Sequence, residues 1–274
     1  MKTAAALAIL ATMLGAGAPG AQEQILVGGA GSMIPLMQEV AAAYQSRNSG
    51  DRVEIVPNSL GTGGGFKAAQ AGRLAIGLTV RPPKPEEKGR LMYRSLGLMP
   101  VVVAVNHSVA VADLSEAQVC GILAGRIRSW KEVGGPDAPI VALSRTGDDG
   151  DTLALRKHLG CSQDLKEGAE VVAFARAGEM VAALGTRPGT IGLTTLGAVH
   201  KAQGRFRAVA IDGVAPTAEA VRAGRYRLAK ECGLVTAGEP DGLARRFIDF
   251  VVGPDGQRLL TRSGLVAARV GASQ

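Results

Sequence analysis

The chain has few residues that stack, ligate metals or attack substrates. Aromatic residues make up only 3% of its 274 residues, which argues against a groove that stacks bases or sugar rings. The three histidines and three cysteines are scattered and keep no zinc-ligand spacing, so we expect no metal site and no cofactor. The G-x-S-x-G and H-E-x-x-H signatures are also missing, which indicates that the chain is not an enzyme.

A nucleotide-binding loop is incomplete as well. The segment from Gly61 to Lys67 superficially resembles the P-loop motif G-x-x-x-x-G-K-[ST]. Phe66 separates Gly65 from Lys67, and Ala68 stands where the magnesium-binding hydroxyl is needed. The match therefore fails.

Long apolar runs are absent beyond the amino terminus, where a short one occurs. Met1 and Lys2 precede the apolar stretch Ala4 to Leu14, and small residues follow from Gly15 to Ala21. This run is shorter than the about 20 residues of a membrane span, and its order is that of a secretory signal peptide. We expect residues 1–21 to be removed and the mature protein to be soluble and periplasmic.

Cysteine is scarce but informative once export is expected. An oxidising compartment permits one disulfide and leaves one thiol unpaired. The spacing does not select a pairing, so all three remain open among Cys120, Cys161 and Cys232.

The charge balance is basic, with 31 Lys and Arg against 24 Asp and Glu and a net charge of +7. A basic protein favours acidic partners. No run of Lys and Arg forms a patch, and export argues against nucleic acid. The charge is compatible with a small anionic ligand.

Strand and helix patterns alternate along the chain, which predicts an α/β fold. Met37, Val40, Ala41 and Tyr44 keep the 3.6-residue spacing of one helix face, after a possible cap at Ser32. Further helices are expected over 66–71 and 115–125, from 152, and around 243–251. Strands are expected over 25–28, 53–56, 74–79, 100–106, 140–144, 189–195, 206–211 and 228–235.

Glycine and hydroxyl residues gather where these strands give way to helices. Three such turns are 29–32, 61–65 and 145–152. Ligands of open α/β sheets bind at the carboxyl ends of strands, and helix amino termini offer free N–H groups to an anion. With Arg81 and Arg145 close to strand ends, the three turns predict one shared anion site.

The order of these motifs resembles the phosphate-binding proteins of phosphate ABC transporters. The Gly-Ser turn, G-T-G-G-G-F-K, A-I-G-L-T-V-R and the later Arg before a Gly-Asp-Thr helix start carry the resemblance, as does the closing segment RYRLAKECGLVTAGEPDGLARRFIDFVVGPDGQRLL. The family implies a two-lobed periplasmic-binding-protein fold of type 2, with two crossover strands and phosphate in the cleft. Residues 22–104 plus 226–274 would form lobe one, and 105–225 lobe two. The family also implies a monomer that delivers its ligand to an ABC transporter permease.

The resemblance implies ligand contacts from four segments. Hydroxyl or backbone groups would come from the first two turns and the third strand, and side chains with N–H groups from the fourth loop. The implied residues are Ser32, Met33, Thr62, Gly63, Thr79, Arg81, Arg145, Gly150, Asp151 and Thr152. Asp149 is added to them as a candidate acceptor in the same loop.

Two departures from the family pattern concern acidic groups. Some relatives place a carboxylate after the third strand to accept the proton of hydrogen phosphate, where this chain has Val80. The fourth loop reads Gly150-Asp151-Thr152 instead of S-G-T. Asp149 or Asp151 would then supply the acceptor, or these acids would select a different ligand. A ligand sensor for a membrane receptor and an enzyme on the same fold stay open as alternatives.

Overall fold

The protein is described by a computed structural model that covers residues 23–146 and 149–267. The predicted signal peptide, residues 1–21, lies outside this part of the chain. Among the described residues, no helix combines the length and apolar character needed to cross a membrane.

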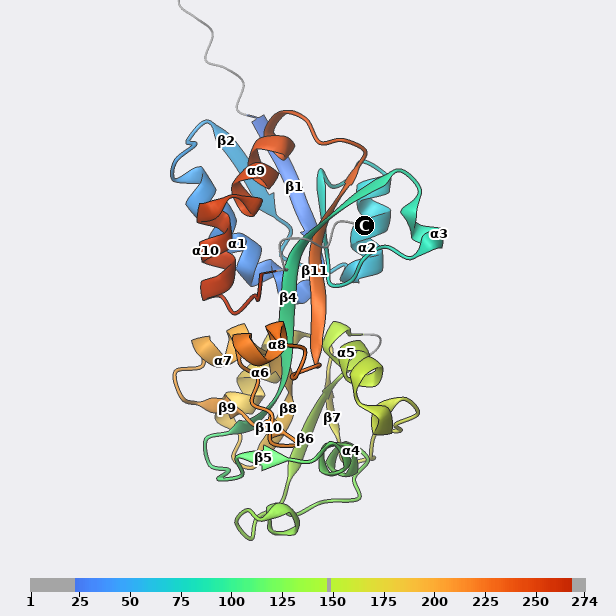
Figure 1. Ribbon diagram of the computed structural model, residues 1–274, viewed down its shortest axis with the longest axis vertical. Coiled ribbons are helices and arrows are strands. Elements are labelled where there is room, and N and C mark those ends of the chain that lie inside the picture. The colour runs from blue at the N-terminus through green and yellow to red at the C-terminus, as the bar shows by residue number, and fades with distance from the viewer. Residues whose placement is uncertain (1–22, 147–148, 268–274) are drawn as a thin grey trace, which may run out of the picture.

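The chain folds into two lobes that lie end to end (Figure 1). The upper lobe of Figure 1 combines the first elements of the chain with the last two helices. Its elements are β1 (Glu23–Gly29), η1 (Gly31–Met33), α1 (Ile34–Gln45), β2 (Asp51–Ile55), α2 (Gly61–Gln70), β3 (Ile76–Thr79), α3 (Pro85–Lys88), α9 (Gly242–Val252) and α10 (Pro254–Arg262).

The lower lobe is formed by the middle of the chain (Figure 1). Its elements are β5 (Asp113–Leu114), α4 (Glu116–Leu123), η2 (Trp130–Val133), β6 (Val141–Arg145), α5 (Gly150–His158), η3 (Gly160–Ser162), β7 (Val172–Phe174), α6 (Ala177–Thr186), β8 (Thr190–Thr195), α7 (Leu196–Lys201), β9 (Phe206–Ala208), β10 (Ala210–Ile211) and α8 (Ala218–Arg222).

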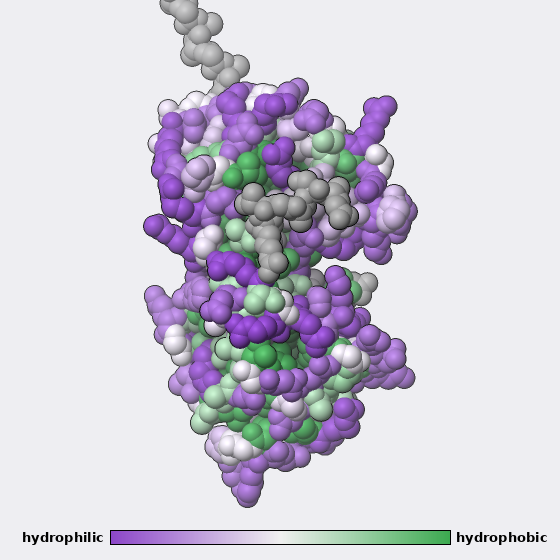
Figure 2. All heavy atoms as spheres, viewed as in Figure 1, coloured by the Kyte–Doolittle hydropathy of each residue, from purple (hydrophilic) through white to green (hydrophobic). Residues whose placement is uncertain are grey.

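Two long strands connect the lobes. β4 (Leu91–Asn106) and β11 (Ala229–Ala237) are antiparallel partners and run from one lobe into the other (Figure 1). The sheet order is β2-β1-β3-β11-β4-β8-β6-β7, so parallel strands of each lobe lie on either side of this antiparallel pair. The space-filling view narrows to a waist where the strands cross (Figure 2). The predicted α/β fold is confirmed.

Each lobe has its own apolar core. Val27, Met37 and Phe247 are fully buried in the upper core, where α1 and α9 pack on the sheet. The apolar residues predicted to share one face of each helix are therefore on the face that the helix buries. Trp130 is fully buried in the lower core, and its indole N–H donates to the Gly189 carbonyl oxygen at 3.0 Å.

The structure corrects two element boundaries. The second helix begins at Gly61, not at Phe66, so the glycine-rich segment is its first turns. A Cβ on Gly65 would lie 2.9 Å from the Leu78 carbonyl oxygen, so close packing of α2 on β3 explains that glycine. β4 begins at Leu91 and not at Pro100, because its first half gains a partner strand, β11, that lies far away in sequence.

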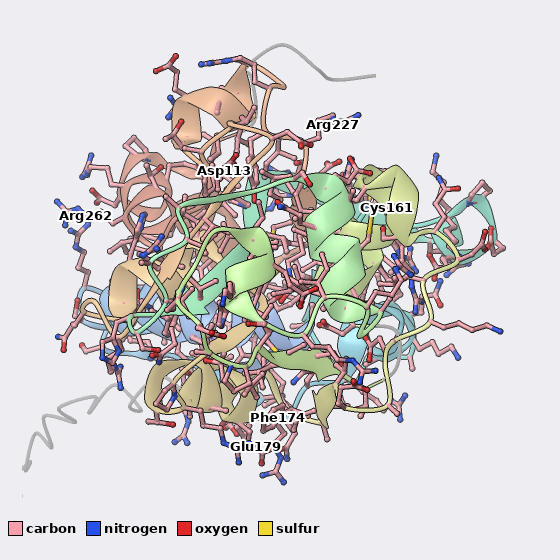
Figure 3. The ribbon with its side chains drawn as sticks, turned by 90° about the horizontal axis from the view of Figure 1, so that it is seen from below. Asp113, Cys161, Phe174, Glu179, Arg227 and Arg262 are labelled. Atoms are coloured by element: carbon pink, nitrogen blue, oxygen red, sulfur yellow. A yellow bond between two sulfur atoms is a disulfide. The ribbon has the colours of Figure 1, made fainter. Side chains whose placement is uncertain are left out.

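A disulfide joins two of the three cysteines, a choice that the spacing left open. Cys120 of α4 is bonded to Cys161 of η3, in the lower lobe. Figure 3 shows Cys161 beside the helices of this lobe. Cys232 is a buried free thiol, and burial raises its pKa to about 12. It therefore stays protonated at neutral pH.

Candidate functional site

The predicted ligand segments come together where the lobes meet. In the upper lobe, Ser32 lies in η1 and Thr62 in the first turn of α2; in the lower lobe, α5 begins at Gly150. α5 faces the upper lobe across the waist (Figure 1). A Cβ on Gly150 would lie 2.9 Å from Val80 Cγ2, which shows how closely the two lobes approach at this point.

Arg145 is the least satisfied charged group of this region. It ends β6, and its side chain is only 14% exposed. Nε and Nη1 are buried and have no hydrogen-bond partner among the described residues. Among the described residues it pairs with Asp149, whose Oδ1 lies 3.9 Å from Nε. A buried guanidinium with free donors is strongly favourable for an oxyanion, which accepts its hydrogen bonds in pairs.

Asp149 is the N-cap of α5. Its Oδ2 accepts a 3.4 Å hydrogen bond from the Thr152 N–H. Burial, and then the nearby Asp151 carboxylate, raise the pKa of Asp149 above its usual value, although Lys230 and Arg145 oppose the shift. This carboxyl therefore holds a proton more readily than an exposed aspartate does.

Asp151 faces a lysine, Lys230, that the sequence patterns did not indicate as part of the site. Lys230 of β11 is 4% exposed, and its Nζ donates to Asp151 Oδ1 at 2.5 Å and to Ser32 Oγ at 3.0 Å. Burial alone would lower the pKa of Lys230, but the Asp151 carboxylate raises it, and the net shift is upward. The only signal in the sequence was the charged pair Lys230 and Glu231 inside a strand that is otherwise largely apolar.

The other implied residues differ in whether their polar groups are free to bind a ligand. Thr62 Oγ1 accepts from the Val80 N–H at 3.2 Å, so its own proton is free to donate. A Cβ on Gly63 would touch nothing within 4 Å, which leaves room beside the start of α2. Thr79 is fully buried, and its hydroxyl donates to the Gly233 carbonyl oxygen at 3.2 Å.

Arg81 is held by the upper lobe itself. Its guanidinium donates to both carboxylate oxygens of Glu87, at 2.5 and 2.7 Å, and lies 5.1 Å from the centre of the Phe66 ring. This ion pair lowers the pKa of Glu87 to about 2. The two arginines implied by the resemblance thus differ: Glu87 accepts from the fork of Arg81, whereas Nε and Nη1 of Arg145 have no hydrogen-bond partner among the described residues.

No metal-binding cluster of His, Cys, Asp or Glu is present in the part of the chain that the structure describes. Among the described residues the site contains two cations, Arg145 and Lys230, and two carboxyls, together with hydroxyl donors and the first turns of two helices. This set of groups can bind a small oxyanion through hydrogen bonds and charge.

Comparison with known proteins identifies the family. A family model described as a PBP superfamily domain matches residues 15–255. The chain belongs to this superfamily. The resemblance predicted from the sequence is confirmed.

Two phosphate-binding proteins match most of this chain in sequence. The phosphate-binding protein PstS of Bacillus subtilis is 26% identical over 250 residues, which are 90% of this chain and 81% of that protein. PstS of Borreliella burgdorferi is 22% identical over 255 residues, which are 89% of this chain and 90% of that protein. These names describe binding proteins, in agreement with the prediction that the chain is not an enzyme.

Solved structures show the same fold. A putative phosphate ABC transporter substrate-binding protein from Clostridium perfringens, solved with bound phosphate, superposes with a TM-score of 0.79 at 27% identity and covers 90% of this chain and 100% of its own. An ABC-type phosphate transport receptor from Vibrio cholerae superposes with a TM-score of 0.69 at 20% identity. The match covers 89% of this chain and 100% of that protein. The predicted two-lobed binding-protein fold is confirmed.

Proposed function

We propose that this chain captures phosphate between its two lobes and delivers it to an ABC transporter permease. The observation that carries the proposal is Arg145, whose buried Nε and Nη1 have no hydrogen-bond partner in the part of the chain that the structure describes. The Clostridium perfringens relative, which is described with bound phosphate, supports the choice of ligand.

The proposed contacts come from both lobes. Ser32, Met33, Thr62 and Gly63 would contribute hydroxyl and N–H donors from above, and Arg145 with the first turn of α5 would contribute from below. Thr79 contributes its backbone at most, since its hydroxyl is already used. Arg81 falls outside the proposed set because Glu87 already accepts from its fork.

The proposed mechanism is closure of two bodies around the ligand. Residues 22–104 with 226–274 would move as one lobe and residues 105–225 as the other, bending at β4 and β11. Export to the periplasm through a signal peptide at residues 1–21 is part of the proposal. The Cys120–Cys161 disulfide supports it, because disulfides persist in oxidising compartments.

A ligand screen tests the proposed function. The mature protein is heated with phosphate, arsenate, sulfate, molybdate or a phosphonate, and the affinities are then measured by calorimetry. A ligand at about 100 times its Kd adds about 2.7 kcal/mol to the free energy of unfolding. We expect phosphate to give the largest shift; a protein stabilised by none of these anions would contradict the proposal.

Asp149→Asn should raise the affinity for sulfate relative to phosphate. At neutral pH phosphate retains a proton and sulfate does not, so a carboxylate that accepts this proton repels sulfate. Asp149 is the better acceptor because the Lys230 ammonium already occupies Asp151. Asparagine is an equally good N-cap, so α5 should keep its start. Calorimetric titrations give the ratio; an unchanged ratio would remove Asp149 as the acceptor.

Gly150→Ala should weaken phosphate binding by about 1–3 kcal/mol, the usual range for overpacking. The added methyl would lie 2.9 Å from Val80 Cγ2 in the opposite lobe, so it hinders closure without entering the core of either lobe. The matched control is Gly178→Ala in α6, where a Cβ meets nothing within 4 Å. Equal affinity of the two variants in calorimetry would show that the lobes do not close at Gly150.

A further inference from the structure

Lys230 lies at the centre of the crossover between the lobes. It is on β11, and its register partner on β4 is Met99. Lys230 is almost completely buried, where a charged side chain is tolerated only with partners. Those partners come from opposite lobes: Ser32 belongs to the upper lobe and Asp151 to the lower.

The contact with Ser32 determines the direction of its hydroxyl. An ammonium can only donate, so Ser32 Oγ accepts the 3.0 Å hydrogen bond from Lys230. The single proton of the serine then points away from Lys230 and is free for another acceptor. A serine held in this way is a donor, as an anion requires.

The contact with Asp151 determines the charge of the site. Arg145 ends β6 and Asp149 caps α5, and Asp149 Oδ1 lies 3.9 Å from Arg145 Nε; Asp151 lies in the first turn of α5. Among the described residues, two carboxyls would face one guanidinium without Lys230, and their net charge would oppose an anion. With Lys230 bonded to Asp151, the second carboxylate is neutralised by its own partner.

We propose that Lys230 is a positioning residue for the oxyanion site, which cancels the charge of Asp151 and directs the Ser32 hydroxyl toward the ligand. The proposal rests on the proposed function. It assigns Lys230 an effect on affinity through two other residues, and it does not require Lys230 to touch the ligand.

The test compares Lys230→Met with the double variant Lys230→Met/Asp151→Asn, by calorimetry with inorganic phosphate. Lys230→Met leaves Asp151 uncompensated, so the affinity should fall about thirtyfold or more. The double variant removes that charge as well and should recover about tenfold of the loss. Lys230→Arg, which keeps the charge, should bind more tightly than Lys230→Met.

Circular dichroism and urea unfolding establish that each variant is folded before binding is measured. Removal of both members of a buried ion pair is tolerated better than removal of one, so the double variant remains informative where Lys230→Met is too unstable. A double variant that binds phosphate no better than folded Lys230→Met would overturn the proposal. So would a folded Lys230→Met that binds phosphate as tightly as the parent. If the parent protein binds phosphate, that failure leaves the proposed function standing; if the parent binds none of the screened anions, both fall.

Discussion

Arg145→Ala is expected to weaken phosphate binding by about 2–5 kcal/mol, which is roughly 30- to 5,000-fold in Kd. The reason is the buried fork of Arg145: Nε and Nη1 have no hydrogen-bond partner among the described residues, and the side chain is 14% exposed. An oxyanion that satisfies these donors gains charge-assisted hydrogen bonds that water does not replace. Isothermal titration calorimetry of the parent and the variant measures the difference.

Two further variants distinguish the shape of Arg145 from its charge. Arg145→Lys keeps the charge but not the planar fork, so its affinity should lie between those of the parent and Arg145→Ala. Arg176→Ala is the control, since Arg176 is largely exposed and paired with Glu179 on the surface of the lower lobe. Equal affinities for the parent and Arg145→Ala would place the anion away from Arg145.

Removal of the disulfide is expected to lower the free energy of unfolding by about 4 kcal/mol. Cys120 and Cys161 are 41 residues apart, and a cross-link over a loop of that length restricts the unfolded chain strongly. The double variant Cys120→Ala/Cys161→Ala, compared with the oxidised parent by urea unfolding, gives the difference. The loss should be confined to stability, because the bond joins α4 to η3 within the lower lobe.

The free thiol supplies the control for the disulfide. Cys232→Ala leaves the cross-link in place and should be destabilised less than the double variant. Addition of a reductant should lower the free energy of unfolding of the parent and of Cys232→Ala, and should leave that of the double variant unchanged. A parent protein whose unfolding is insensitive to reductant would show that the bond does not contribute.

Much of the fold could be predicted because its signals are local. The 3.6-residue spacing of Met37, Val40, Ala41 and Tyr44 is the buried face of α1, and all four side chains are buried. Two elements of the lower lobe were missed, the three-residue strand β7 and the helix α6. β4 was predicted too short because its first half is a strand only through its pairing with β11.

The candidate site was predictable in its segments and not in its pairings. Turns rich in glycine and hydroxyl residues mark strand ends from sequence alone. The structure places Ser32 in η1, Thr62 in the first turn of α2 and Arg145 at the end of β6. Whether a guanidinium is free depends on what folds against it. Arg81 and Arg145 look alike in sequence, yet Glu87 binds the first, and no described residue is a hydrogen-bond partner of Nε or Nη1 of the second.

The sequence by itself determined the alternation of strands and helices, the scarcity of aromatic and metal-binding groups, and the family to which the chain belongs. Tertiary structure alone decided three things: the pairing of Cys120 with Cys161, the burial of Lys230 between Ser32 and Asp151, and the approach of Gly150 to Val80. The physical reason is distance along the chain. Periodicity and turn chemistry act over a few residues, whereas Ser32 and Lys230 lie 198 residues apart and meet only when both crossover strands are in place.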